Sequence, residues 1–246
     1  MPDENNQVIV DELLDKAQQA AREFSAYSEA QVRRIVDAIC NAAEVTAEFY
    51  SEWAIRETGK GRAADKTTKK LVTAKQFRAD NVADYVRFAV DADKKMVCFP
   101  KPAGVVMTLI PVTNPVSTVV FKALSCLITR NAVVLSPHPG AQEVSTHAAD
   151  HFARIAEAAG APKNCIQIVR KPSVPLVNDL MKDSRTNVIL ATGGPGMVRA
   201  AYSSSNPALG VGPGNVPVYV DRTADLTKAA DRIVRSLGFD NGMPCT

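Results

Sequence analysis

The feature that most constrains the fold is an alternation that begins after Pro102. Short apolar runs rich in β-branched residues are separated there by stretches with helical periodicity. The runs are bounded by Gly, Pro, Asn or Ser and span 105–110, 132–135, 165–169, 187–191 and 216–220. Strands that are apolar throughout are buried on both faces, as in a parallel sheet with helical crossovers. The pattern predicts an α/β fold with a doubly wound, mostly parallel, Rossmann-like sheet.

Helical periodicity before this region predicts an N-terminal helical segment. Apolar residues recur at a spacing of about 3.6 residues in 13–24 and again in 32–43. Ser28 and Gln31 have the spacing of a capping box at the start of the second of these helices. A further apolar stripe predicts a helix over 141–160, between two of the expected strands.

The stretch 86–101 has the pattern of a β-hairpin. Two short β-prone runs, 86–90 and 96–99, are separated by the charged residues 91–95. An unpaired two-stranded ribbon is only marginally stable in water. We therefore expect the hairpin to support self-association, and the complete protein to be a homo-oligomer.

Composition limits the classes of partner. The chain has 246 residues, 46% of them hydrophobic, which suffices for a sizeable core. Its 29 basic and 26 acidic residues are dispersed without a run of like charges, so a nucleic-acid partner is not expected. No segment reaches 18 uninterrupted apolar residues, so no membrane span is expected. Five cysteines without a CxxC pair indicate reduced thiols, and hence the cytoplasm.

Ligands of doubly wound sheets bind at the carboxyl ends of the strands, so the loops there contain the candidate site residues. In the loop 111–115, the Asn114 amide could face a developing oxyanion, or it could cap the next helix. In the loop 136–140, two prolines bracket His138. This rigid loop could present Ser136 or His138 to a ribose, or it could serve folding alone.

Two glycine clusters follow later strands. Gly193 and Gly194 lie where a strand passes into a helix, so a pyrophosphate could approach backbone N–H groups and the helix N-terminus. Gly-rich turns also occur without a ligand. The second cluster, 210–215, is expected to form no regular structure. It could admit a flat ring close to the backbone, or it could simply reverse the chain.

His147 and His151 are spaced by one helical turn, as zinc ligands sometimes are. They lack the adjacent Glu of the HExxH motif, and we therefore expect no metal site.

A candidate nucleophile is Cys245. Asn241 and Gly242 precede it and favour an unusual backbone that could expose a thiol for attack. A single cysteine without such a context is more often inert.

Taken together and in this order, these segments resemble the CoA-acylating branch of the aldehyde dehydrogenase superfamily, in particular the aldehyde dehydrogenase half of bifunctional aldehyde-alcohol dehydrogenases. The resemblance extends over nearly the whole chain from about Val10. It depends on the stretches 113–115, 121–122, 130–139, 159–163, 190–204, 210–215 and 239–242.

The resemblance implies a catalytic role for two residues. Cys245 matches the nucleophile, which would form a thiohemiacetal with a short-chain aldehyde. Asn114 matches the side-chain donor of the oxyanion hole and would act with the backbone N–H of Cys245. Hydride would pass to the nicotinamide of NAD, and coenzyme A would release the acyl group as acyl-CoA in a reversible reaction.

The resemblance also implies a set of cofactor-binding residues. These are Pro111, Thr113, Ser136, His138, Pro139, Thr192, Gly193, Gly194, Gly210 and Gly212. Hydrolytic relatives have a Lys at the position of Ser136 and commonly a Glu at that of Pro139. The loop therefore agrees with the acylating branch, and NAD is expected, with NADP left open.

Gly210 bears on the acyl acceptor. Hydrolytic relatives have a Glu general base at this position, because water, with a pKa of about 15.7, needs a base to attack a thioester. A thiol with a pKa of about 8.5 is already partly ionised. Gly210 therefore favours transfer to CoA. A hydrolytic aldehyde dehydrogenase and a non-catalytic nucleotide-binding fragment are the alternatives.

The resemblance further implies two domains. Residues 1–220 are expected to form a dinucleotide-binding domain, with the hairpin at about 86–101 for oligomerisation. Residues 221–246 are expected to begin the catalytic domain. Family members continue well past the nucleophile, so we expect this chain to be partial and to bind nucleotide without turnover.

Overall fold

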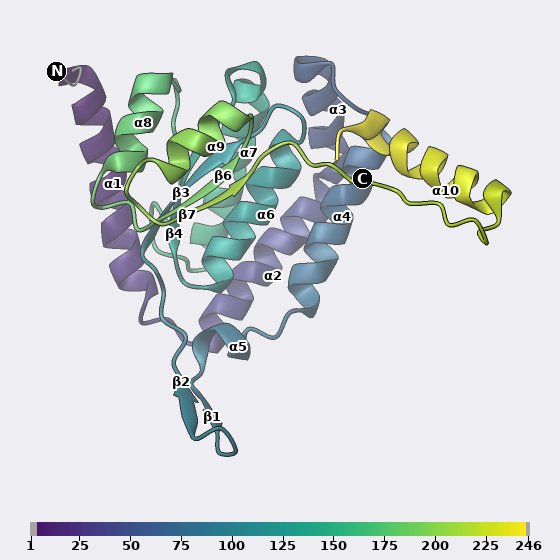
Figure 1. Ribbon diagram of the computed structural model, residues 1–246. Coiled ribbons are helices and arrows are strands. Elements are labelled where there is room, and N and C mark those ends of the chain that lie inside the picture. Colours follow the sequence, from purple (N-terminus) through teal and green to yellow (C-terminus); the bar gives the residue numbers. More distant parts are fainter. Residues whose placement is uncertain (1–3, 245–246) are drawn as a thin grey trace.

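A five-stranded parallel sheet forms the centre of the protein in a computed structural model that describes residues 4–244 (Figure 1). The order of the strands is β5-β4-β3-β6-β7. Their bounds are Val105–Ile110 (β3), Ala132–Pro137 (β4), Ile166–Ile168 (β5), Val188–Thr192 (β6) and Ala208–Val211 (β7). Both β3 and β4 are buried at every position, as their nearly continuous apolar sequences predict. The polar exceptions are Thr108 and Ser136. The predicted α/β fold class is confirmed.

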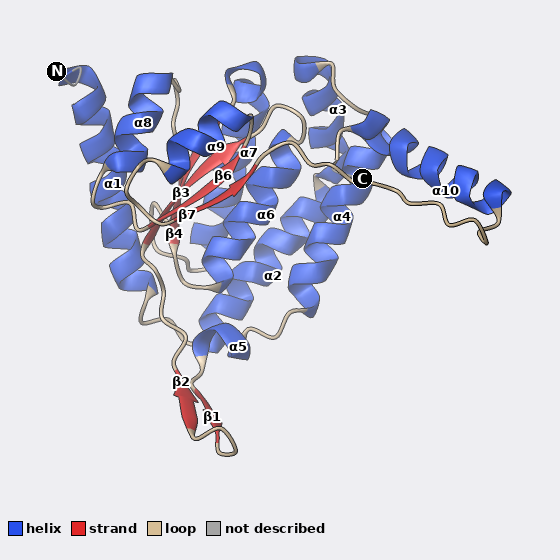
Figure 2. Cartoon of the chain, viewed as in Figure 1, coloured by secondary structure: helices blue, strands red, loops and turns tan. Residues whose placement is uncertain are grey.

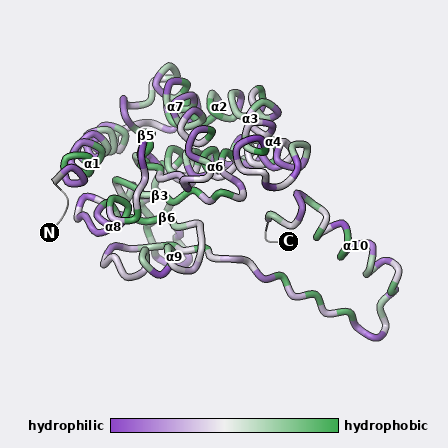
Figure 3. The backbone as a smooth tube through the Cα atoms, turned by 90° about the horizontal axis from the view of Figure 1, so that it is seen from above, coloured by the Kyte–Doolittle hydropathy of each residue, from purple (hydrophilic) through white to green (hydrophobic). Residues whose placement is uncertain are grey.

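The direction of the crossovers reverses within this sheet. From β3 the chain passes through α6 (Pro115–Ile128) to β4 and through α7 (Gln142–Ala158) to β5. It then crosses back through α8 (Val174–Lys182) to β6, on the other side of β3, and continues through α9 (Pro195–Tyr202) to β7. Because parallel crossovers are right-handed, the reversal places α6 and α7 on one face and α8 and α9 on the other (Figures 2 and 3).

Four N-terminal helices enlarge these two layers. Helix α1 (Glu4–Phe24) packs against β4 and beside α8. Helices α2 (Glu29–Val45), α3 (Ala47–Thr58) and α4 (Ala63–Ala79) pack against α6 or α7 on the opposite face. The apolar stripes that predicted α1 and α2 are buried, except for Leu13 and Ala42, which are partly buried. At the start of α2, the Gln31 Oε1 atom accepts a hydrogen bond from the Ser28 N–H at 2.9 Å, as the predicted capping box requires.

The predicted hairpin is present and projects away from the body of the protein (Figure 1). Strand β1 (Ala89–Asp91) pairs with β2 (Met96–Cys98) in antiparallel register. The first strand begins later than expected, because Val86 ends a short helix, α5 (Ala83–Val86). The hairpin leaves large apolar side chains exposed, among them Phe88, Val90, Val97 and Phe99.

The prediction of a fifth strand at 216–220 is wrong. Residues 216–220 are exposed and pair with no strand in the described part of the chain, and the fifth strand is instead β7, which contains Gly210. The cause is a close contact with α9. A Cβ atom on Gly210 would lie 2.6 Å from the Val198 Cγ1 atom and 2.7 Å from the Tyr202 Cε2 atom. The expectation that 210–215 has no regular structure is therefore also wrong at Gly210 and Val211, which belong to β7. The glycine lets strand and helix approach.

The chain leaves the sheet after β7. Residues 212–225 lead to helix α10 (Leu226–Gly238), which has no buried residue (Figure 1). A 3-10 turn, η2 (Phe239–Gly242), then returns to contact α4. Within residues 4–244, no helix is both long and apolar enough to cross a membrane.

Candidate active site

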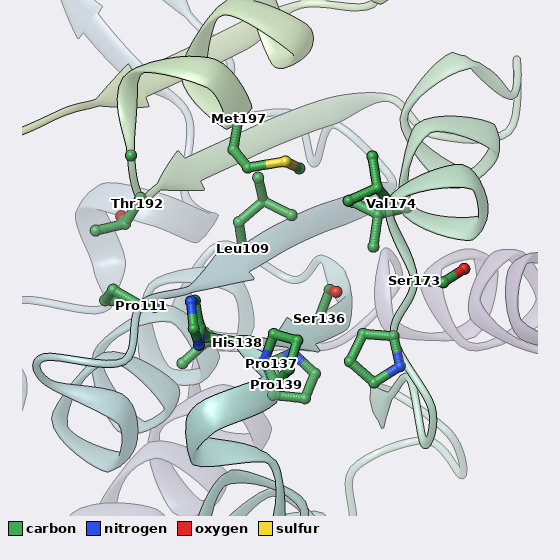
Figure 4. A pocket seen from close by; sticks show the side chains of 15 residues that line it. Leu109, Pro111, Ser136, Pro137, His138, Pro139, Ser173, Val174, Thr192 and Met197 are labelled. Carbon is green, nitrogen blue, oxygen red and sulfur yellow. The ribbon is translucent and has the colours of Figure 1, made fainter. Parts of the chain in front are cut away.

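A pocket of about 350 Å³ lies at the carboxyl ends of β3, β4 and β6, where the crossovers reverse (Figure 4). Its size is within the range of small-molecule sites, and its place is where doubly wound sheets bind ligands. The lining comes from the ends of three strands and from the starts of α8 and α9. It consists of Leu109, Ile110, Pro111, Ser136, Pro137, His138, Pro139, Pro172, Ser173, Val174, Val177, Thr192, Gly193, Gly194 and Met197.

The structure brings most of the predicted cofactor residues together in this pocket. These are Pro111, Ser136, His138, Pro139, Thr192, Gly193 and Gly194. Thr113, Gly210 and Gly212 do not contribute to the lining that the described residues form. The Thr113 carbonyl instead accepts a hydrogen bond from the Lys66 Nζ atom at 2.7 Å.

The loop after β4 is rigid, as its prolines predict. The His138 Nδ1 atom accepts a hydrogen bond from the Gly140 N–H at 3.0 Å, and Pro139 begins the short 3-10 turn η1 (Pro139–Ala141). The imidazole is thereby fixed at the pocket wall. The loop therefore forms a fixed turn and also presents side chains to the pocket, so the two alternatives for it do not exclude each other.

Sequence reasoning missed the opposite wall of the pocket. Ser173 and Val174 at the start of α8, and Met197 on α9, lie across the cavity from the prolines of the β4 loop (Figure 4). Ser173 is the N-cap of α8, and its Oγ atom accepts from the Leu176 N–H at 3.3 Å. A serine two residues before Pro175 is a helix-start signal that could have placed Ser173 at this edge of the sheet.

Asn114 occupies the N-cap position of α6, yet its side chain does not cap the helix. Its Nδ2 atom donates to the Met243 carbonyl at 3.4 Å. Its Oδ1 atom accepts from the Lys69 Nζ atom. Asn114 thus occupies the cap position, but its amide forms hydrogen bonds with Lys69 and Met243 instead of with the helix. The Nδ2 end of the amide faces the segment that leads to Cys245.

Cys245 itself lies outside the described residues. The turn before it is anchored by Asp240, whose side chain is fully buried. Its carboxylate accepts from the Arg62 N–H at 2.6 Å, from the Lys66 Nζ atom at 3.1 Å and from the Lys69 Nζ atom. Its backbone N–H donates to the Asp65 Oδ2 atom at 2.8 Å.

This turn has an unusual backbone. Asp240, Asn241 and Gly242 have φ angles of 49°, 54° and 68°. The left-handed region costs a non-glycine residue about 1–2 kcal/mol, so two such residues in succession need support from their surroundings. The hydrogen bonds of Asp240 supply that support.

Burial and charge shift the titration of this cluster. Burial alone would raise the pKa of Asp240, but the hydrogen bonds from Lys69, the Arg62 N–H and Lys66 hold it below its ordinary value. Burial lowers the pKa of Lys66. Burial, together with the charges of Lys66 and Lys69, lowers the pKa of Lys70 to about 7. The Asp240 carboxylate is therefore ionised at neutral pH.

The sequence offered a signal for this cluster that was missed. Lys66, Lys69 and Lys70 are spaced i, i+3, i+4 and so share one face of α4. Charged residues on a helix are usually solvated, but Lys66 and Lys70 are each only 1% exposed. Asp240, which accepts from Lys66 and Lys69, is more than 170 residues away in the sequence. The Lys70 Nζ atom donates instead to the Ser51 Oγ atom at 2.6 Å.

A second hollow of about 480 Å³ adjoins both regions. Thr192 lines this hollow and the first pocket alike. Lys69, Phe121 and Phe239 also contribute to its wall. The hollow thus joins the first pocket, at Thr192, to Lys69, whose Nζ atom donates to the Asn114 Oδ1 atom.

His147 and His151 lie in an aromatic cluster. The His147 Nδ1 atom is 3.0 Å from the Tyr50 Oη atom, and its ring centroid is 4.9 Å from that of Trp53. Among residues 4–244, no group of three or more His, Cys, Asp or Glu side chains is placed to hold a metal ion.

The sequence of the chain is similar to a known protein family and to characterised proteins. Residues 2–246 match the model of the aldehyde dehydrogenase family. The chain is 41% identical to the bifunctional aldehyde-alcohol dehydrogenase of Escherichia coli over 236 residues, which are 95% of the chain and 26% of that protein. It therefore spans about a quarter of the length of this relative.

Solved structures of aldehyde dehydrogenases are also similar to this chain. An acetylating aldehyde dehydrogenase from Geobacillus thermoglucosidasius superposes with a TM-score of 0.88 at 40% identity, over 98% of this chain and 54% of that one. A propionaldehyde dehydrogenase from Rhodopseudomonas palustris, with bound CoA and an acylated cysteine, superposes with a TM-score of 0.86 at 32% identity, over 96% and 54%. The resemblance to the acylating branch is confirmed, and the chain spans about half the length of these structures.

Proposed function

The chain belongs to the aldehyde dehydrogenase family, and on this premise we propose that it supplies the nucleotide site and the nucleophile of an acylating enzyme. The reaction converts a short-chain aldehyde, CoA and NAD reversibly to acyl-CoA and NADH. The observation that carries the proposal is the contact of the Asn114 Nδ2 atom with the Met243 carbonyl, because Cys245 follows two residues later.

The chemistry assigned to these residues is an addition, an oxidation and then one acyl transfer. The Cys245 thiolate attacks the aldehyde carbon, a C–S bond forms, and Asn114 Nδ2 donates to the resulting oxyanion. NAD, when bound, accepts the hydride that leaves this carbon. The CoA thiolate then attacks the thioester on Cys245, a new C–S bond forms, and the Cys245 thiolate is released.

Two observations favour CoA over water as the acyl acceptor. A Cβ atom on Gly210 would collide with Val198 and Tyr202, so the position that holds the general base in hydrolytic relatives has no room here for a Glu. The acylated cysteine and CoA in the propionaldehyde dehydrogenase support the same step. A thiol with a pKa near 8.5 requires less base assistance than water.

The first pocket fits a dinucleotide. Apolar walls from Pro139, Val174 and Met197 suit a flat ring, and the Ser136 and Ser173 hydroxyls can bind a ribose. The start of α9 at Gly194, which has no side-chain cap, suits a pyrophosphate. Within the described residues, the lining includes no Lys or Arg. This favours NAD, because the additional phosphate of NADP is commonly met by a cation.

The proposal extends to the organisation of the complete protein. Residues 1–220 act as the dinucleotide-binding domain and 221–246 begin the catalytic domain, which is consistent with the departure of the chain from the sheet after β7. The exposed apolar residues of the hairpin support a homo-oligomer. The four cysteines of the described part, none in a disulfide, support a cytoplasmic location.

The test is an assay of NADH formation from acetaldehyde and from propionaldehyde with the full-length protein, with and without CoA. We expect turnover that requires CoA and a product that contains the acyl thioester. Turnover to a free acid without CoA would instead indicate the hydrolytic enzyme. NAD binding without turnover in either condition would indicate a non-catalytic nucleotide-binding protein.

A further inference from the structure

We propose that Lys69 is a positioning residue, which orients the Asn114 amide with its Nδ2 atom toward the nucleophile segment, and that Asp240 holds Lys69 in place. This inference rests on the proposed function, because it gives the amide a task in the reaction. It is carried by the contacts among the three side chains, and by the backbone of the turn at Asp240.

The orientation of the amide is the first step of the argument. An Asn side chain has a donor end and an acceptor end of nearly equal shape, and an oxyanion can be stabilised only by the donor. The Lys69 ammonium group can only donate, and it contacts the Asn114 Oδ1 atom. The Nδ2 atom is therefore directed to the other side, where it contacts the Met243 carbonyl.

The charge of Lys69 adds to this effect. A cation at the carbonyl end of an amide polarises the group, so its N–H becomes a stronger donor. The stronger N–H donor stabilises the substrate oxygen most when negative charge develops on it in the transition state. An interaction that is stronger in the transition state than in the ground state accelerates the chemical step. Lys69 also lines the hollow that meets the first pocket at Thr192.

Asp240 joins the two parts of this arrangement. Its carboxylate contacts Lys69 and Lys66, while its backbone belongs to the left-handed turn that leads to Cys245. The same residue therefore fixes the lysine that orients the amide and the segment that presents the nucleophile. Lys66 secures the loop before Asn114 as well, through the Thr113 carbonyl at 2.7 Å.

The test compares Lys69→Met, which keeps the length of the side chain without the charge, with Lys69→Arg, which keeps a donor. Lys75→Met is the matched control, since Lys75 is exposed on the same helix. In the full-length protein we expect K69M to lower kcat at least about tenfold, a fraction of what loss of an oxyanion donor costs. KM for NAD should change less than about threefold, K69R should recover most of the loss, and K75M should match wild type.

A double-mutant cycle decides whether Lys69 acts through Asn114. In the Asn114→Ala background, K69M should cause little further loss of kcat, because the group that it orients is gone. An equal loss in both backgrounds would overturn the proposal, and so would wild-type kcat in K69M. If K69M is not folded by circular dichroism, Lys69→Gln replaces it in the cycle, and failure of both to fold would show a structural role and overturn the proposal.

Failure of this inference is distinguishable from failure of the proposed function. If wild type shows CoA-dependent turnover and the cycle is additive, only the role of Lys69 is lost. If wild type shows no CoA-dependent turnover, the proposed function fails. If NADH still forms without CoA, the cycle on that kcat tests Lys69 by itself. If there is no turnover at all, the proposal for Lys69 is overturned with the proposed function.

Discussion

Gly61 and Asp240 approach each other so closely that a side chain on the glycine would occupy the place of the carboxylate. A Cβ atom built on Gly61 would lie 2.8 Å from the Asp240 Cγ atom and 2.8 Å from the Lys66 Nζ atom. Gly61 also has a φ of +86°, which disfavours any other residue. The loop before α4 is therefore shaped around the carboxylate that anchors the turn before Cys245.

The first prediction concerns this contact. Gly61→Ala should lower the free energy of unfolding by about 2–4 kcal/mol, as the sum of backbone strain and a clash with a buried ion pair, and should lower kcat. Gly59→Ala is the matched control, since Gly59 also has a positive φ but nothing within 4 Å of an added Cβ. It should cost only about 1–2 kcal/mol and leave kcat unchanged. Urea unfolding and steady-state kinetics measure both, and equal effects of the two variants would contradict the role assigned to the contact.

A second prediction tests the packing of β7 against α9. Gly210→Ala should lower the free energy of unfolding by about 1–3 kcal/mol, because the methyl group must displace Val198 or Tyr202. Gly212→Ala, with nothing within 4 Å, should change it by less than about 0.5 kcal/mol. Urea unfolding of the two variants under identical conditions decides the matter. A neutral G210A would show that this strand can move, and that a Glu at this position is not excluded by space.

The third prediction is a pH dependence that arises from Lys122. This side chain is 4% exposed and donates to the carbonyls of Leu109 and Leu190 at 2.8 Å and 2.6 Å. Burial lowers its pKa from 10.5 to about 7. Between these values the unfolded chain holds a proton that the folded chain lacks, so the free energy of unfolding rises with pH, by at most about 1.4 kcal/mol per unit.

Lys122→Met removes this contribution. The stability of wild type minus that of K122M should therefore increase between pH 7 and pH 9, by about 2 kcal/mol in total. Lys70 has a similar lowered pKa, but it is present in both proteins and cancels. Urea unfolding at pH 7, 8 and 9 gives the comparison, with K75M as the exposed-lysine control. Parallel curves for wild type and K122M would mean that Lys122 keeps its proton when folded.

A fourth prediction concerns the nucleotide pocket. Met197→Trp should fill part of the cavity and raise the Kd for NAD at least about tenfold, with little change in thermal stability, because Met197 is only half-buried. Arg199→Trp, on the same helix but outside the lining, serves as the control and should bind NAD like wild type. Isothermal titration with NAD provides the measurement. Equal affinity in M197W and R199W would place the dinucleotide elsewhere.

Local sequence patterns predicted the features that depend on nearby residues. The runs over 105–110 and 132–135 became buried strands, because every position in them except Thr108 is apolar. The capping box at Ser28 could be predicted because both partners lie within four residues. The loops after these strands then converged in one pocket, because parallel strands end at the same edge of a sheet.

Features that depend on contacts between residues far apart in the sequence could not be predicted from local patterns. The run 216–220 is β-branched, yet it pairs with no strand in the described part of the chain, while the weaker segment 208–211 forms β7 because Gly210 fits beneath Tyr202. Likewise, nothing local indicates that Lys66 and Lys69 are partners of Asp240. The sequence shows three lysines on one face of a helix, and only the fold shows that two of them, Lys66 and Lys69, contact a buried carboxylate.

The most direct test of the proposed mechanism is to incubate the full-length protein with acetyl-CoA and to identify the modified residue by peptide mass spectrometry. The reverse half-reaction should transfer the acetyl group to the Cys245 thiolate and release CoA, and the adduct should disappear when excess CoA is added. Cys245→Ala should form no adduct. An acetyl group found instead on the exposed Cys98, or a C245A variant that is acylated as readily as wild type, would contradict the assignment of the nucleophile.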